Sequence, residues 1–94
     1  MDNEEILKGR MLFALARKRK WGESHTAYEN MIRSLRAESF GKDMMKIINK
    51  LAEELFKEGL VIKKPTHYGL QVSLNPSQAQ EIKKRIKDIL GFDI

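Results

Sequence analysis

Residues 39–57 read SFGKDMMKIINKLAEELFK, and their periodicity predicts the amphipathic helix around which the rest of the chain is organised. Apolar residues recur at spacings of four, three and four, which places them on one helical face: Met44, Ile48, Leu51 and Leu55. Polar residues gather on the opposite face: Lys42, Lys46, Asn49, Lys50, Glu53 and Lys57. We expect the apolar face to pack against a core, which leaves the polar face available to a partner.

The length of 94 residues indicates a single domain, residues 1–94. The absence of cysteine excludes disulfides, thiolate zinc sites and cysteine nucleophiles. His25 and His67 lack the spacing of metal ligands, and no glycine-rich phosphate loop is visible, so we expect no metal, no cofactor and no catalytic site. No apolar run is long enough to span a membrane, and the acidic N-terminal segment does not resemble a signal peptide. We therefore expect a soluble, cytoplasmic protein.

The formal net charge of +5 and the sequence pI of about 9.6 favour a polyanionic partner, nucleic acid first. Basic residues gather in two places, residues 17–20 (RKRK) and residues 83–87. The first run has two interpretations. It is either a solvated helix terminus, where cations suit the negative end of the helix dipole, or a patch that contacts phosphates.

Two helices are predicted before residue 39. Asp2 or Asn3 can cap the first, which we expect to end at Gly22 in a left-handed conformation. Thr26 and Glu29 have the spacing of a capping box, which predicts a second, short helix ending near Arg36. A turn of a few residues then leads to the central helix, which is the plan of a helix-turn-helix unit.

A β-hairpin and a fourth helix are predicted after Gly59, the expected cap of the central helix. Residues 60–64 (LVIKK) and 70–74 (LQVSL) have strand patterns, and turn-forming residues separate them. Asn75 and Pro76 then start the last helix, at about residues 76–90. Its apolar stripe consists of Ala79, Ile82, Ile86, Ile89 and Leu90.

This order of elements resembles a winged helix-turn-helix DNA-binding domain, of the kind found in small archaeal proteins of the transcription-regulator type. The resemblance is carried by Leu51, Leu55 and the Gly59-Leu60-Val61 run, by the hairpin tip at residues 63–69, and by the return strand at residues 72–74. It implies an α+β, mostly α fold. The expected parts are a three-helix core with a two-stranded wing at about residues 4–74, and an extra C-terminal helix.

The resemblance also implies a DNA-binding mode, with the central helix in the major groove and the wing on the backbone. Carried over by position, the groove-facing residues are Ser39, Lys42, Lys46, Asn49 and Lys50, and the wing residues are Lys63, Lys64 and His67. Asn49 could pair with adenine, whereas the lysines suit phosphates better than bases. Alternatively, these lysines are ordinary solvated side chains, and exposed lysines also protect edge strands from aggregation.

The sequence does not decide what the apolar face of the last helix packs against. Its apolar residues can pack against the first helix of the same chain, or Ile82, Ile86, Ile89 and Leu90 can form a homodimer seam together with the N-terminal helix. The leading hypothesis is a double-stranded DNA-binding transcription regulator. The alternative, suggested by Glu53, Glu54 and Glu58 beside the basic row, is a protein-interaction module within a larger complex. RNA binding is less favoured because aromatic stacking platforms are lacking.

Overall fold

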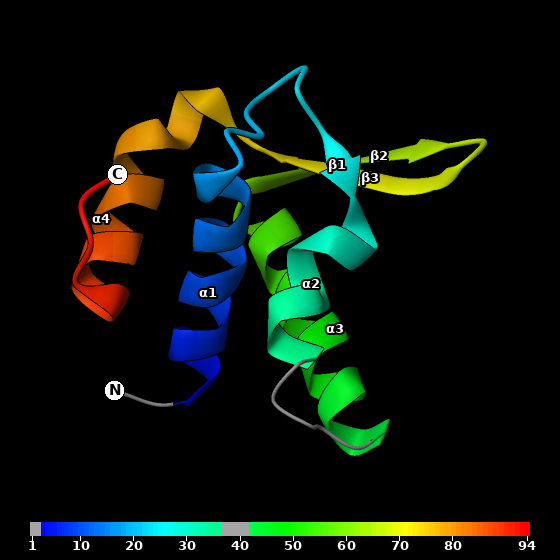
Figure 1. Ribbon diagram of the computed structural model, residues 1–94, viewed down its shortest axis with the longest axis horizontal. Coiled ribbons are helices and arrows are strands. Elements are labelled where there is room, and N and C mark those ends of the chain that lie inside the picture. The colour runs from blue at the N-terminus through cyan, green and yellow to red at the C-terminus, as the bar shows by residue number, and fades with distance from the viewer. Residues whose placement is uncertain (1–2, 37–41) are drawn as a thin grey trace.

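The computed structural model describes residues 3–36 and 42–94, and within them the prediction of an α+β, mostly helical fold is confirmed. Figure 1 shows α1 in the middle, with α4 on one side and α2 and α3 on the other. The elements follow in this order: α1 (Asn3–Arg17), β1 (Thr26–Ala27), α2 (Tyr28–Arg36), α3 (Lys42–Lys57), β2 (Val61–Thr66), β3 (Gly69–Leu74), a short 3-10 turn η1 (Pro76–Gln78) and α4 (Ala79–Leu90).

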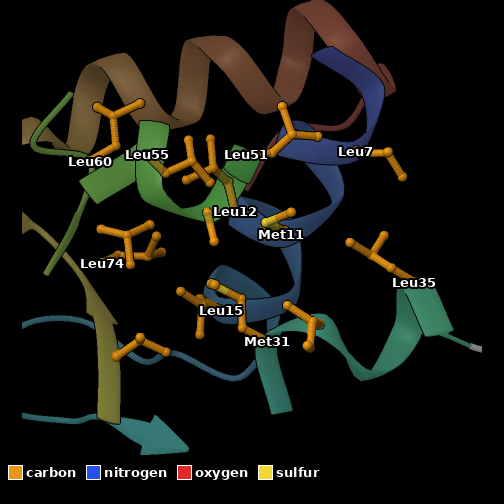
Figure 2. Close-up of a cluster of buried hydrophobic side chains, with 14 of the residues drawn as sticks. Leu7, Met11, Leu12, Leu15, Met31, Leu35, Leu51, Leu55, Leu60 and Leu74 are labelled. Atoms are coloured by element: carbon orange, nitrogen blue, oxygen red, sulfur yellow. The ribbon is translucent and has the colours of Figure 1, made fainter. Parts of the chain in front are cut away.

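The core forms around α1, which packs against α2, α3 and α4. Met11 and Leu12 of α1 are completely buried and lie amid leucines and methionines of α2, α3 and β3 (Figure 2). Ile48, Leu51 and Leu55 of α3 are also completely buried, as their spacing predicts, whereas Met44 near the start of the helix is only partly covered. The apolar face of α3 is therefore the face that holds this helix to the molecule.

The sheet has three antiparallel strands in the order β1-β3-β2, where the sequence indicated two. The predicted hairpin is present, with Val61 opposite Leu74 and Thr66 opposite Gly69. The additional strand is β1, in which Thr26 pairs with Val72. The predicted capping box is accordingly wrong. Thr26 lies in the sheet, and its hydroxyl accepts a hydrogen bond from the Asn30 side chain at 2.8 Å.

The end of α1 also differs from the prediction. The left-handed cap is Arg19, at φ 57°, and not Gly22. The Arg19 N–H donates to the Ala16 carbonyl and the Lys20 N–H to the Leu15 carbonyl, the paired bonds that close a helix C-terminus. Gly22 has a positive φ as well, but it serves the sheet, because its N–H donates to the Leu74 carbonyl at 2.9 Å.

Two other predicted helix ends, at Gly59 and Asn75, are confirmed. Gly59, at φ 78°, caps α3, and the Leu60 N–H donates back to the Leu55 carbonyl. Asn75 caps the turn η1 through its side-chain oxygen, which accepts from the Ser77 N–H, and α4 follows without a break in the chain's course. The described part of α3 begins at Lys42, and the predicted start at Ser39 falls within residues 37–41, which lie outside the described part of the chain.

The apolar stripe of α4 packs against α1 of the same chain. Ile82 and Ile86 are completely buried in the core, and Ile89 lies so close to Gly9 that a Cβ there would be 2.8 Å from its Cγ2. Leu90 is partly buried against the same core. The hypothesis that these residues form a homodimer seam is therefore wrong for Ile82 and Ile86, because side chains already enclosed by their own chain have no surface to offer a second copy.

Candidate functional site

The exposed face of α3 carries Lys46, Asn49, Lys50 and Glu53, one to two turns apart on the side of the helix opposite its buried leucines. Lys42 is the first residue of α3, and Ser39 lies outside the described residues. Lys46 forms no ion pair with any residue in the described ranges, so its ammonium group is free for a partner. The polar row predicted from periodicity is therefore a continuous surface as far as the described side chains extend.

Asn49 is oriented by a neighbour that the sequence did not indicate. The Tyr28 hydroxyl, from the first turn of α2, donates to Asn49 Oδ1 at 2.7 Å. Burial, followed by the charges of Glu53 and Glu29, raises the pKa of Tyr28, so the hydroxyl stays protonated at neutral pH and remains a donor. This bond fixes which way the amide of Asn49 points and leaves its NH₂ group to the outside.

Lys50 lies among carboxylates. Its ammonium is 3.9 Å from Glu54 and 4.0 Å from Glu4, and the lysine side chain is 62% exposed. Ion pairs at such distances on an open surface contribute little energy, on the order of 0.5 kcal/mol. Lys50 can therefore leave these carboxylates for a phosphate at small cost.

Beneath this face, a cluster of charged side chains around the buried Lys8 connects α1, α3 and α4. Lys8 of α1 is only 5% exposed, and its ammonium lies 2.7 Å from Glu54 and 3.6 Å from Glu58. Arg85 of α4 reaches Glu58 from the other side at 3.2 Å. Glu54 and Glu58 are thus tied chiefly to residues of α1 and α4. These contacts set the orientation of α3 relative to α1 and α4.

The pKa values of this cluster follow from its geometry. Burial lowers the pKa of Lys8, but the hydrogen bond to Glu54 and the charges of Glu58 and Glu54 outweigh it, so the pKa of Lys8 is raised overall. The hydrogen bond from Lys8 lowers the pKa of Glu54, against a smaller effect of burial. Both groups are therefore charged at neutral pH, and the contact between them is a true ion pair.

The hairpin β2–β3 projects away from the helices (Figure 1). Lys63 and Lys64 are both exposed, but adjacent residues of a strand point to opposite faces. Lys63 lies on the side of α3, with its ammonium 3.8 Å from Glu53 and 5.3 Å from the centre of the Phe56 ring. Lys64 lines a small hollow on the other face of the sheet, together with His25. The two lysines, grouped by the sequence, therefore belong to different surfaces.

The tip of the hairpin is a tight, internally bonded turn. The Thr66 hydroxyl donates to the Gly69 carbonyl at 2.7 Å and accepts from the Tyr68 N–H at 3.2 Å. His67 is exposed, and Tyr68 is 95% exposed, so both side chains stand clear of the molecule. His67 is thus a tip residue that lies apart from the polar face of α3.

None of the described helices combines the length and the apolar character that crossing a membrane requires. Residues 3–36 and 42–94 contain no group of three or more side chains suited to hold a metal ion. Comparison of the chain with protein-family models, curated proteins and solved structures gives no match. The function is therefore inferred from the geometry of α3 and the hairpin.

Proposed function

We propose that this protein is a winged helix-turn-helix domain that binds double-stranded DNA, with α3 in the major groove and the β2–β3 hairpin as a wing along the backbone. The observation that carries the proposal is the meeting of α3 and the hairpin at Lys63, whose ammonium is 3.8 Å from Glu53. Because of this contact, the exposed row of α3 and one face of the basic hairpin form a single surface. The contacts between α3 and β2 support the proposal, since they hold the hairpin beside the end of α3.

The chemistry of this surface suits a duplex. Lys46 and Lys50 are exposed cations on a helix of 16 residues, and the natural partners of such flexible point charges are phosphates. Asn49 lies between them in the chain. Its oxygen accepts from the Tyr28 hydroxyl, and its NH₂ group donates to no described residue. An amide held in this way can donate to an acceptor on a base edge in the major groove.

Glu53 limits the part of α3 that contacts DNA. It lies on the same exposed face, one turn after Asn49, and a carboxylate repels phosphates. Lys63 compensates this charge in part. We therefore infer that α3 meets DNA with the segment from Lys42 to Lys50, and that its second half supports the wing. A role in transcription regulation follows as the expected use of such binding.

The test is a double charge reversal, Lys46→Glu with Lys50→Glu, measured by fluorescence anisotropy with a labelled random-sequence duplex at low salt. We expect affinity to fall at least about a hundredfold, because two phosphate contacts become repulsive. The matched control is Lys84→Glu with Lys87→Glu, which changes the net charge equally on α4. Circular dichroism and thermal melting check that each variant is folded. Equal loss of affinity in both pairs would show that α3 has no special role.

A protein-interaction module is the second candidate, and one observation favours it. The cations of the α3 surface are partly compensated by acidic neighbours, Lys50 by Glu54 and Lys63 by Glu53, which suits a protein surface of mixed charge. NMR titration distinguishes the two functions. Shifts of the Lys46–Lys50 segment and the hairpin on adding duplex support DNA binding. No shift with any duplex at low salt, with intact fold, favours the module.

A further inference from the structure

A hollow of about 410 Å³ opens between the end of α1, the loop that follows it and the start of α4. Its lining is mostly apolar: Ala16, Arg19, Trp21, Pro76, Ala79, Lys83 and Ile94. Ala16, Trp21 and Ala79 are half-buried, whereas Arg19 and Lys83 are exposed. Apolar groups therefore form the floor and two cations stand at the mouth. The volume is that of a site for a small organic molecule.

The walls of this hollow are held in place by the backbone. On either side of Trp21, the Leu74 N–H donates to the Lys20 carbonyl at 2.7 Å and the Gly22 N–H donates to the Leu74 carbonyl at 2.9 Å. Gly22 lies directly against Pro76, since a Cβ there would be 3.1 Å from Pro76 Cγ. The backbone on both sides of Trp21 is therefore fixed to the end of β3, and the side chain of Trp21 packs partly buried against the core.

The charge at the mouth is uncompensated. Neither Arg19 nor Lys83 forms an ion pair with any residue of the described chain. The other cations of α4 do have acidic partners: Lys84 with Asp88, Arg85 with Glu58, and Lys87 with Asp93.

We propose that this hollow binds an amphipathic organic anion, a carboxylate with an unbranched apolar chain of medium length. The chain covers the half-buried floor around Trp21 and displaces water from it. The carboxylate accepts charge-assisted hydrogen bonds from Arg19 and Lys83. This site is separate from the polar face of α3, and the proposal holds whether or not the protein binds DNA.

The experiment uses the full chain and its own reporter, because Trp21 is the one tryptophan in the sequence. Decanoate, kept below its micelle concentration, is titrated at low salt while the emission of Trp21 is followed. We expect a saturable change, and binding of the neutral analogue decanol that is at least about fivefold weaker. Arg19→Gly and Lys83→Ala should each weaken decanoate binding about threefold, and the double variant about tenfold.

The variants separate recognition from folding. Glycine suits the positive φ of residue 19, so Arg19→Gly removes the cation without disturbing the turn. Lys84→Ala removes a cation of the same helix outside the hollow and should leave decanoate affinity unchanged. The proposal is overturned if decanol binds as tightly as decanoate, if Lys84→Ala weakens binding as much as Lys83→Ala, or if no saturable change occurs. It is also overturned if Trp21 emission depends on protein concentration alone, which would place a second copy in the hollow.

Discussion

Lys8 contributes both to the stability of the protein and to the orientation of α3. A buried ammonium is costly unless it is paired, and here Glu54 and Glu58 supply the partners at 2.7 Å and 3.6 Å. Glu54 lies in α3 and Glu58 directly follows it, and both reach Lys8, while Lys46 and Asn49 of the same helix are exposed. The ion pair therefore selects which side of α3 is presented to a ligand.

Removing the buried charge tests this role. Lys8→Met keeps most of the side-chain volume but removes the buried cation from Glu54 and Glu58, which retain only their contacts with Lys50 and Arg85. We expect the free energy of unfolding to fall by about 1–3 kcal/mol, less than for fully buried pairs because Glu54 and Glu58 are partly exposed. Urea denaturation measures the change. Lys50→Met, an exposed lysine beside the same Glu54, is the control and should cost less than about 0.5 kcal/mol.

The same pair gives the protein a defined response to acid. The pKa of Glu54 is lowered in the folded state by the hydrogen bond from Lys8, so the unfolded state binds more protons near the ordinary value of 4.5. The contribution of Glu54 is present above that pH and is lost as the pH falls through the folded pKa. Denaturation from pH 7 to pH 3 should show that Glu54→Gln is less stable than the unaltered protein at pH 7, with the difference closing in acid. A difference that stays constant over this range would contradict the ion pair.

At the scale of elements, the contact between α1 and α4 depends on the absence of a side chain at Gly9. A Cβ at this position would meet Ile89 at 2.8 Å, closer than packed atoms tolerate. Glycine is a poor helix former, so its presence within α1 is explained by this close approach. The isoleucine stripe of α4 therefore packs against α1 of the same chain.

Gly9→Ala should therefore destabilise the protein by about 1–2 kcal/mol, although alanine is the better helix former. Adding Ile89→Ala removes the clashing Cγ2. In the double variant, the two losses should be less than additive by at least about 1 kcal/mol. Thermal or urea unfolding of the two single variants and the double variant gives this coupling. Additive losses would mean that α1 and α4 do not touch at these residues.

For the whole molecule, the charge distribution predicts how binding should depend on salt. The net charge is +5, and the exposed cations of α3 and the hairpin share one surface with Glu53. If each phosphate contact releases about 0.9 counterions, the slope of log affinity against log salt counts these contacts. The charge-reversal variant Lys46→Glu with Lys50→Glu should bind too weakly for a full salt series, so Lys46→Ala with Lys50→Ala is measured instead. We expect the slope of log affinity against log salt for this variant to be shallower by about 1.8 than for the unaltered protein. An unchanged slope would mean that neither lysine meets a phosphate.

Local sequence patterns were sufficient to predict most of the fold. The buried face of α3, the hairpin and the caps Gly59 and Asn75 all follow from short-range rules of periodicity and turn chemistry. The capping box at Thr26 and the cap at Gly22 were wrong for a common reason. The backbones of both residues pair with strand β3, far along the chain, and such partners cannot be detected in a local window of sequence.

The sequence by itself determined the helices, the hairpin and their order, and also the buried stripe of α3 and its lysine-rich opposite face, because these depend on spacing within one helix or strand. Strand β1 was not among them. Only the tertiary structure decided which cations are free and which are paired. Tyr28 reaches Asn49, Lys8 reaches Glu54, and Lys63 and Lys64 fall on different faces of the sheet. Each of these facts depends on side chains that packing brings together from separate elements, and charge and hydrogen bonding act through distance in space.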